Sequence, residues 1–322
     1  MSESLHVLVT GANGFVGRQL CDVLTKQGSR VTAAVRTVEA CPVAGQVVAV
    51  DLLDGSALSA CMKTVDVVVH LAARAHVLDD RCPDPLAAFR QANVTVAISV
   101  ARAAIRAGVK RFVFISSIGV NGAESHGQPF SETMPAAPHA PYAVSKLEAE
   151  LELTALFAGT QTELVIVRPP LVYDAAAPGN FSRLLRLVEA RVPLPFAGVE
   201  NRRSMISLSN LVSFIGVVLE HPLAAGETFV IADGESVSTR QMVDALASGM
   251  GHRAKFFFVP GVVVKCLLRA VRRQNMFTQL YGSLEVDSTK AVRLLGWVPP
   301  QSPQQALKQA GCRFKARGAR EQ

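Results

Sequence analysis

Apolar runs alternate with amphipathic segments along the first half of the chain. The runs are short and largely apolar, and they cover residues 7–9, 31–35, 47–50, 65–71, 112–115 and 164–167. Such runs are typical of strands that are buried on both faces of a parallel sheet. Between them, apolar residues recur at helical spacing, as from Val16 to Leu24 before Gly28 and again over Leu86–Ala107. The alternation predicts an α/β fold with a doubly wound parallel sheet and helices on both of its faces.

The pattern changes after Arg168. Five prolines between residues 169 and 195 divide the chain into shorter segments, with helices expected at 181–190 and 211–219 and a strand at 228–231. Ser238 and Gln241 have the spacing of a capping box, which predicts a helix that begins there. Asp287 is a suitable N-cap for a helix that continues to Leu295.

These changes predict how the chain is divided. We expect residues 1–170 to form the large sheet domain and residues 171–312 to form mainly a smaller C-terminal α/β lobe. Residues 313–322 are polar and basic, and we expect a frayed basic tail there.

Composition narrows the choice of partner. Apolar residues make up 49% of the chain, which is ample for a core, and the formal net charge is +7. A basic balance can indicate nucleic acid, a membrane surface or a small anionic ligand as the partner. With one Trp and three Tyr, the chain offers little for base stacking, so we expect an anionic small molecule and no nucleic acid.

The N-terminus has no basic region followed by an apolar core, and no run of 18 apolar residues occurs, so a cytoplasmic location is expected. The most apolar stretch, residues 256–271, is interrupted by Lys265 and Arg269. We expect core with one solvated face there, and a membrane-surface helix is the less favoured alternative. The six cysteines include no CxxC pair and no His cluster accompanies them, so we expect reduced thiols and no metal site.

A glycine-rich turn joins the first expected strand to the first helix. It reads TGANGFVG from Thr10 to Gly17. In this context Gly11 permits a tight turn, Gly14 lets the backbone approach a pyrophosphate, and Gly17 lets helix and strand pack closely. The helix N-terminus would present free N–H groups to phosphates. The turn therefore predicts a Rossmann-like dinucleotide site, with an ordinary βα turn as the alternative.

The end of the second strand bears on the choice of cofactor. An acidic residue at this place binds the ribose 2′-hydroxyl of NAD. The chain has Arg36 there, and a guanidinium could bind a 2′-phosphate, so NADP(H) is favoured and NAD(H) remains possible. A solvated loop arginine is the alternative. Asp51, after the third strand, is placed to meet the adenine amino group, or else to cap the next helix.

Tyr142 and Lys146 lie four residues apart in an expected helix that begins near Pro141, so they share one face. A nearby ammonium lowers the pKa of a phenol. Tyr142 could then give a proton to a carbonyl oxygen of the substrate or take one from a hydroxyl group. Ser116 and Ser117 end the fifth strand, where ligands of such sheets bind. Either serine could orient a substrate oxygen.

Taken together, these motifs make the sequence resemble the extended short-chain dehydrogenase/reductase family, especially its nucleotide-sugar branch. The motifs that carry the resemblance are TGANGFVG at 10–17, Asp51-Leu52, HLAA at 70–73, Asn93, the segment from Phe112 to Gly122, YAVSK at 142–146 and RPPLVY at 168–173. The branch includes UDP-hexose 4-epimerases and 4-keto-sugar reductases. Its catalytic serine or threonine lies 25 residues before its tyrosine, which selects Ser117 over Ser116.

The resemblance implies a set of site residues. Those that would contact the cofactor are Gly11, Asn13, Gly14, Phe15, Val16, Gly17, Arg36, Asp51, Leu52, Leu71, Ala72, Ala73, Asn93, Tyr142, Lys146, Pro169 and Val172. Those that would contact the sugar nucleotide are Ser117, Val120, Asn121, Asn180, Phe196 and Arg203. Helix capping and a surface ion pair are the alternatives for Asn180 and Arg203. The chain departs from the family pattern at Asn121, Asp174 and Leu284.

Two reactions fit this resemblance. A 4-keto reductase would reduce a UDP-linked 6-deoxy N-acetylhexosamine for bacterial surface polysaccharide, whereas a 4-epimerase would oxidise C4 and return the hydride to the other face. Arg36 favours NADP(H), and hence the reductase. A non-catalytic dinucleotide sensor is a third possibility, disfavoured because Tyr142 and Lys146 are both present. A homodimer is the assembly usual in the family.

Overall fold

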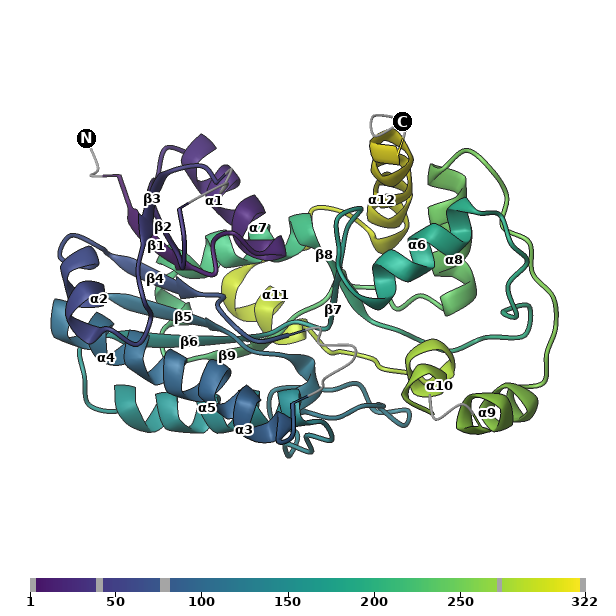
Figure 1. Cartoon of the computed structure of the whole chain (residues 1–322), viewed down its shortest axis with the longest axis horizontal. Coiled ribbons are helices and arrows are strands. Elements are labelled where there is room, and N and C mark those ends of the chain that lie inside the picture. The colour runs from purple at the N-terminus through teal and green to yellow at the C-terminus, as the bar shows by residue number, and fades with distance from the viewer. Residues whose placement is uncertain (1–3, 39–42, 76–81, 271–273, 319–322) are drawn as a thin grey trace.

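The computed structural model describes residues 4–38, 43–75, 82–270 and 274–318. Figure 1 shows two lobes, and the larger one is built on a seven-stranded sheet in the order β3-β2-β1-β4-β5-β6-β9. All neighbouring strands are parallel. The strands are β1 (His6–Thr10), β2 (Arg30–Val35), β3 (Gln46–Ala49), β4 (Val67–His70), β5 (Arg111–Ile115), β6 (Glu163–Arg168) and β9 (Thr228–Val230). The predicted α/β, Rossmann-like fold is confirmed.

Helices cover both faces of the sheet because successive strand residues point to opposite sides and both sides are apolar. Val7 and Val9 face one layer, while Leu8 between them faces the other. The first layer consists of α1 (Phe15–Lys26), α7 (Leu208–Glu220) and α11 (Thr289–Leu295). The second consists of α2 (Gly55–Cys61), α4 (Val96–Ala107) and α5 (Pro141–Phe157).

The expected helix at 86–107 contains an irregularity. It is made of α3 (Pro85–Arg90), a π-helical segment (Gln91–Thr95) and α4 in direct succession. Asn93 lies inside the π-helical segment and is buried. Such widened turns are rare and often occur at functional sites.

The smaller lobe is mainly helical and lies to the right in Figure 1. Its elements are β7 (Leu171–Tyr173), α6 (Asn180–Glu189), β8 (Met205–Ser207), α8 (Thr239–Gly249), α9 (Gly261–Ala270), α10 (Gln274–Tyr281) and α12 (Pro303–Gly318). Its core contains Phe181, Leu246 and Leu307, from α6, α8 and α12. Three elements that follow residue 170, namely α7, β9 and α11, belong instead to the large sheet's layers. The domain boundaries proposed from sequence stay a prediction.

Several local predictions can be compared with the structure. The capping box of Ser238 and Gln241 is present at the start of α8. The N-cap of α11 is Ser288 and not Asp287, although the Asp287 carboxylate accepts a hydrogen bond from the Thr289 backbone N–H at 2.9 Å. The expected frayed tail is wrong for residues 313–318, which continue α12 because that helix packs against α8.

The apolar stretch from 256 onward was expected to be core with one solvated face. In the structure it contains α9, none of whose residues is buried. Val271, the last residue of this stretch, lies outside the described residues, as does Cys41. Within the described ranges no helix is long and apolar enough to cross a membrane.

Candidate active site

The carboxyl ends of β1, β4 and β5 meet at one edge of the sheet. Thr10, His70 and Phe114 are neighbours in register across these three strands. The glycine turn, the HLAA segment and the two serines follow these strand ends directly, so three separate sequence motifs converge at this edge.

The glycine turn requires glycine at two positions. Gly11 has φ +66°, and a Cβ there would lie 2.8 Å from the Ala72 backbone nitrogen. A Cβ on Gly17 would collide with the Gly11 carbonyl oxygen. The Gly14 N–H donates to that same oxygen at 2.9 Å. The turn is therefore closed against the segment after β4, with the N-terminus of α1 directed at the space beside it.

A cavity of about 500 Å³ lies beside this turn. Nine of the predicted cofactor residues line it: Gly11, Asn13, Gly14, Arg36, Asp51, Leu52, Leu71, Ala72 and Ala73. The residues present fit a dinucleotide, because the backbone can approach closely at the glycines and the walls beyond are apolar. The remaining predicted cofactor residues do not line this cavity, and Phe15, Val16 and Val172 pack against the cores.

Part of the cavity wall was not predicted from the sequence. Ala88, Ala92 and Val96 line it from α3, the π-helical segment and the start of α4. Their spacing of four residues places them on one helix face. That spacing could have indicated a common face, but nothing in the sequence says that the face meets the glycine turn.

Arg36 is exposed and lines the same cavity at the end of β2. Asp51 is the only acidic residue among the described residues that line it. Asp51 does not cap a helix: the N-cap of α2 is Asp54, whose carboxylate accepts hydrogen bonds from the Ser56 and Ala57 backbone N–H groups. The alternative role considered for Asp51 is therefore excluded.

Lys146 is buried at the sheet edge, with 2% of its surface exposed. Its ammonium donates to the Ile115 carbonyl at 2.8 Å and lies 4.5 Å from the centre of the Phe114 ring. Burial lowers the pKa of Lys146 to about 8. Burial likewise raises the pKa of Tyr142 to about 12, so the phenol holds its proton at neutral pH in this structure.

Ser117 is half-buried, and its hydroxyl accepts a hydrogen bond from the Gly119 N–H at 3.1 Å. A Cβ on Gly119 would lie 3.3 Å from the Ala143 side chain, so the loop that carries Ser117 packs directly on α5 beside Tyr142. Ser116 is buried, and its hydroxyl has no hydrogen-bond partner among the described residues. The structure thus brings Ser117, Tyr142 and Lys146 to one place.

The Asn93 side chain joins two segments of the chain at this edge of the sheet. Its side-chain oxygen accepts from the Arg74 backbone N–H at 2.7 Å, and its amide donates to the Ser145 hydroxyl at 3.0 Å. Ser145 in turn donates to the Tyr142 carbonyl at 2.8 Å. Asn93 therefore ties the segment after β4 to the first turn of α5. The part that Ser145 plays in this could not be predicted from the sequence motifs.

Val120 and Asn121, predicted to contact the substrate, are both buried. The Asn121 side chain accepts from the Arg168 guanidinium at 3.2 Å and donates to the Ser131 carbonyl at 3.0 Å. Arg168 also forms a buried ion pair with Glu150 at 2.5 Å. In this arrangement Asn121 holds the segments after β5 and β6 together. The Pro169 carbonyl accepts a hydrogen bond from the Ile118 N–H at 3.0 Å, which also joins these two segments.

Asn180 and Arg203 both contact α10 and the residues that follow it. The Asn180 amide donates to the Gln279 side chain at 2.6 Å. The Arg203 guanidinium donates to the Thr278 and Gly282 carbonyls at 3.3 and 3.0 Å. Burial lowers the pKa of Arg203. The two residues therefore belong to one region. Among the described residues, Arg203 forms no ion pair and Asn180 makes no capping hydrogen bond to α6.

Phe196 is buried, and its ring meets the edge of the Tyr281 ring at 6.0 Å. The Tyr281 hydroxyl donates to the Pro195 carbonyl at 2.7 Å. These contacts fasten the segment around Phe196 to the end of α10, next to the residues that hold Arg203.

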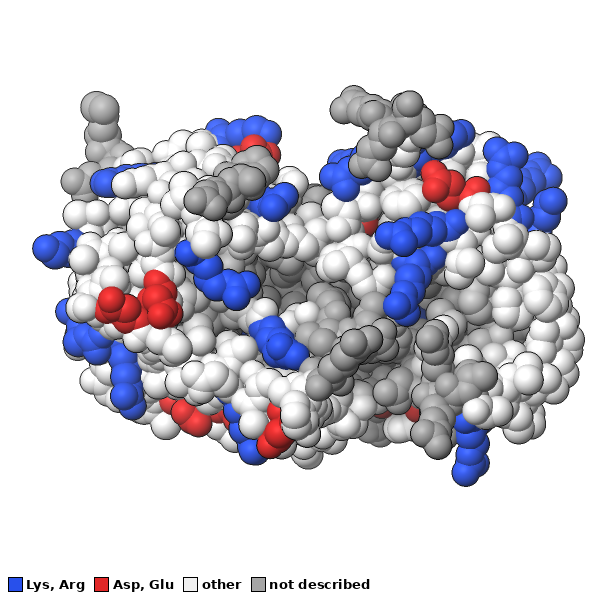
Figure 2. All heavy atoms as spheres, in the orientation of Figure 1, with Lys and Arg blue, Asp and Glu red and all other residues white. Residues whose placement is uncertain are grey.

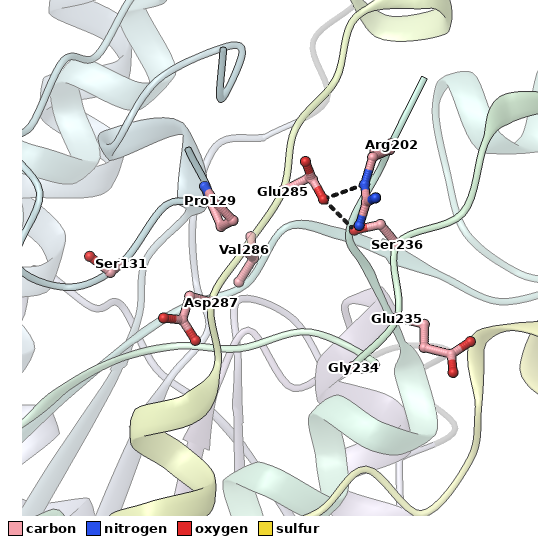
Figure 3. A pocket seen from close by; sticks show the side chains of 9 residues that line it. All are labelled: Pro129, Ser131, Arg202, Gly234, Glu235, Ser236, Glu285, Val286 and Asp287. Atoms are coloured by element: carbon pink, nitrogen blue, oxygen red, sulfur yellow. Dashed lines mark hydrogen bonds and ion pairs between the residues drawn. The ribbon is translucent and has the colours of Figure 1, made fainter. Parts of the chain in front are cut away.

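A second pocket, of about 530 Å³, lies near β9 and the segment before α11 (Figure 3). Arg202 pairs there with Glu285 at 2.6 Å, and Glu285 also accepts from Ser236. None of the predicted catalytic or substrate residues is among the described residues that line it. We therefore assign the chemistry to the sheet edge, where the titratable groups and the glycine turn converge.

Charge around the site is mainly positive. Figure 2 shows Lys and Arg side chains on both sides of the hollow between the two lobes. Such a distribution attracts anions such as phosphates. No cluster of three or more potential metal ligands occurs in the part of the chain that the structure describes.

Comparison with known proteins gives consistent results. Residues 7–232 match the NAD dependent epimerase/dehydratase family. The chain is 39% identical over 311 residues to a UDP-glucose 4-epimerase of Vibrio cholerae, covering 96% of this chain and 95% of that one. It is 28% identical to an N-acetyl-alpha-D-glucosaminyl-diphospho-ditrans,octacis-undecaprenol 4-epimerase of Escherichia coli O157:H7, covering 79% and 75%.

The fold is also that of a solved UDP-glucose 4-epimerase from Stenotrophomonas maltophila, with bound NAD and formylated UDP-arabinopyranose. The TM-score is 0.81 at 21% identity, and the match covers 99% of this chain and 100% of that one. At this identity the likeness establishes the shared fold.

Proposed function

We propose that this chain, which belongs to the NAD dependent epimerase/dehydratase family, moves hydride at C4 of the sugar of a UDP-hexose. The observation that carries this proposal is that Ser117, Tyr142 and Lys146 lie together at the same edge of the sheet as the glycine turn and its cavity. The first candidate reaction is 4-epimerisation, because the Vibrio cholerae relative over nearly the whole chain is a UDP-glucose 4-epimerase.

The proposed cofactor residues divide into two groups. The glycine turn and the N-terminus of α1 would hold the diphosphate, while Arg36, Asp51 and Leu52 would surround the adenosine. Nicotinamide, when bound, accepts or donates the hydride. Ala72, Ala73 and the helix face formed by Ala88, Ala92 and Val96 would give the bound cofactor apolar contacts.

The proposed role of Tyr142 is proton transfer at the C4 oxygen. With its pKa near 12, the phenol is ready to donate a proton to a ketone oxygen. To accept a proton from a C4 hydroxyl it needs positive charge nearby, which Lys146 on the same helix face supplies when protonated. Ser117 would donate a hydrogen bond to the same oxygen and hold it in line with Tyr142.

The second candidate is reduction of a 4-keto group on a UDP-linked 6-deoxy N-acetylhexosamine. Arg36 favours it, because a guanidinium at the end of β2 suits the 2′-phosphate of NADP and a reductase must draw on a pool of reduced cofactor. The sequence alone favours this reaction, whereas the similarity to a 4-epimerase supports epimerisation at least as well. A homodimer, a cytoplasmic location and a place in surface-polysaccharide synthesis stay parts of this proposal.

One experiment separates the candidates. The purified protein is incubated with UDP-N-acetylglucosamine or UDP-glucose in the presence of NAD⁺, and separately with the 4-keto-6-deoxy derivative of UDP-N-acetylglucosamine in the presence of NADH or NADPH. An epimerase forms UDP-N-acetylgalactosamine with no net change at the reduced nicotinamide absorbance band. A reductase consumes NADPH with the keto sugar only. Absence of turnover with both sugars, and with UDP-glucose, would contradict the proposal as a whole.

A further inference from the structure

Helix α9 presents an apolar face to solvent. Val262, Val263 and Leu267 are 74%, 46% and 63% exposed, and Cys266 and Ala270 are exposed beside them. These five residues have the spacing i, i+1, i+4, i+5 and i+8, which places them on one side of a helix. Exposed apolar residues scattered singly are ordinary, but a continuous face of them indicates an interaction surface.

The other positions of α9 account for its remaining sides. Val264 and Leu268 are half-buried, and the helix packs against α10. Lys265 and Arg269 are exposed and lie one turn apart along the border of the apolar face. The helix thus has one side toward the protein, one apolar side toward solvent, and a basic edge between them.

The segment that precedes α9 exposes two aromatic side chains as well. Phe257 and Phe258 are 46% and 69% exposed. Backbone hydrogen bonds hold this segment in place: the Phe257 N–H donates to the Leu194 carbonyl at 3.1 Å, and the Phe257 carbonyl accepts from the Ala197 N–H. Two aromatic rings are therefore displayed from an anchored backbone. We call Phe257, Phe258, Val262, Val263, Cys266, Leu267 and Ala270 the α9 face.

Charge decides which partner suits the α9 face. Residues 245–284 contain six Lys and Arg and no Asp or Glu. Four of the six, Arg253, Lys255, Lys265 and Arg269, lie within the described residues and are exposed. Aromatic and aliphatic side chains in a segment whose charged residues are all basic suit an anionic bilayer surface, where the apolar groups enter the acyl boundary and the cations meet lipid phosphates.

The α9 face lies one helix away from the proposed substrate residues. Helix α10, against which α9 packs, supplies Gln279 to Asn180 and the Thr278 carbonyl to Arg203. Figure 1 shows α9 and α10 side by side at the end of the smaller lobe. A surface bound through α9 would therefore adjoin the substrate-binding side of the molecule.

We propose that the α9 face docks the protein on the surface of a membrane that contains anionic lipid. The helix lies in the interface, with Val263 and Leu267 toward the acyl chains and Lys265 and Arg269 toward the phosphates. This inference does not depend on which sugar the enzyme uses. A second copy of the chain is the competing occupant of the face.

The test is vesicle flotation of the full-length protein. One set of vesicles contains phosphatidylethanolamine and phosphatidylglycerol, and the other phosphatidylcholine alone. We expect the protein to float with the first set and far less with the second, and high salt to weaken the binding. Replacing two bordering cations, in K265Q/R269Q, should weaken binding by about tenfold or more, whereas K63Q/R102Q, the matched control at exposed sites elsewhere, should not.

The apolar contribution is tested with V263E/L267E, which we expect to abolish flotation. The control L223E/V298E makes the same charge change at two exposed aliphatic residues of the larger lobe and should float like the unchanged protein. Turnover of a soluble UDP-sugar should be equal in all variants, which separates this inference from the proposed function. Failure of the unchanged protein to float, or flotation of V263E/L267E, would overturn it. The inference would also be overturned if the unchanged protein were a dimer by light scattering that does not float and V263E/L267E were a monomer.

Discussion

Three ionisable side chains lie together at the sheet edge, and burial governs each of them. His70 is fully buried, with its ring stacked between those of Phe112 and Phe114 at 5.9 and 6.0 Å. Its Nδ1 lies 2.9 Å from the Thr10 hydroxyl. Burial, and next the charge of Lys146, lower the pKa of His70 to about 3. The same burial shifts the pKa of Lys146 downward and that of Tyr142 upward.

His70 makes the stability of the fold depend on pH. Its pKa is about 3 in the folded state and near 6.5 in the unfolded chain. Below pH 6.5 the unfolded chain therefore binds a proton that the folded protein does not, and stability falls as the pH falls toward 3. This contribution approaches about 1.4 kcal/mol per pH unit.

We expect the free energy of unfolding of His70→Gln, measured in urea from pH 7 to pH 5, to decrease less steeply than that of the unchanged protein. His139→Gln, the same substitution at an exposed histidine, should leave the slope as it was. Equal slopes for His70→Gln and the unchanged protein would show that His70 does not have the lowered pKa.

At the scale of elements, the join between β1 and α1 has the tightest packing in the proposed cofactor site. Gly17 lies in the first turn of α1, where its α-carbon faces the Gly11 carbonyl. Gly216 lies within α7, and a Cβ there would meet nothing within 4 Å. Alanine at Gly216 therefore shows only the gain from a better helix former. Alanine at Gly17 also places a Cβ against the Gly11 carbonyl oxygen.

Gly17→Ala should lower stability by about 1–3 kcal/mol, because the added methyl group forces α1 away from the turn. Gly216→Ala should raise stability by about 0.5–1 kcal/mol, because alanine loses less conformational freedom in a helix. Denaturant unfolding measures both, and cofactor titration should show weakened binding only for Gly17→Ala. Destabilisation of equal size in the two variants would argue against the close approach.

At the scale of the whole molecule, the sequence predicted those features that short segments determine. Each strand or helix of the alternating pattern, the glycine turn and the Tyr142–Lys146 spacing is indicated by a short run of neighbouring residues. The structure contains the elements that these runs indicate. Features that depend on distant partners were not predictable. The hydrogen bonds of Asn121 to Arg168 and Ser131, which lie 47 and 10 residues away, are an example, whereas its contact with the substrate stays a prediction.

The C-terminus and α9 show the same limit in opposite directions. Residues 313–318 look like a polar tail, yet they continue a helix because α8 lies alongside. The stretch that contains α9 looks like core, yet no element among the described residues covers its outer side. Hydropathy states what a segment can bury, whereas the neighbouring elements decide whether it is buried.

In the proposed mechanism, Tyr142 transfers the proton at the C4 oxygen of the sugar. The most direct measurement compares Tyr142→Phe with the unchanged protein in cofactor affinity and in turnover of the UDP-sugar that serves as substrate. We expect Tyr142→Phe to bind the cofactor with unchanged affinity and to turn over the substrate about 10²–10⁴-fold more slowly, because general acid–base catalysis contributes that much. Tyr281→Phe, which removes a hydroxyl bound to the Pro195 carbonyl, should lose far less. Turnover of Tyr142→Phe equal to that of the unchanged protein would contradict the account.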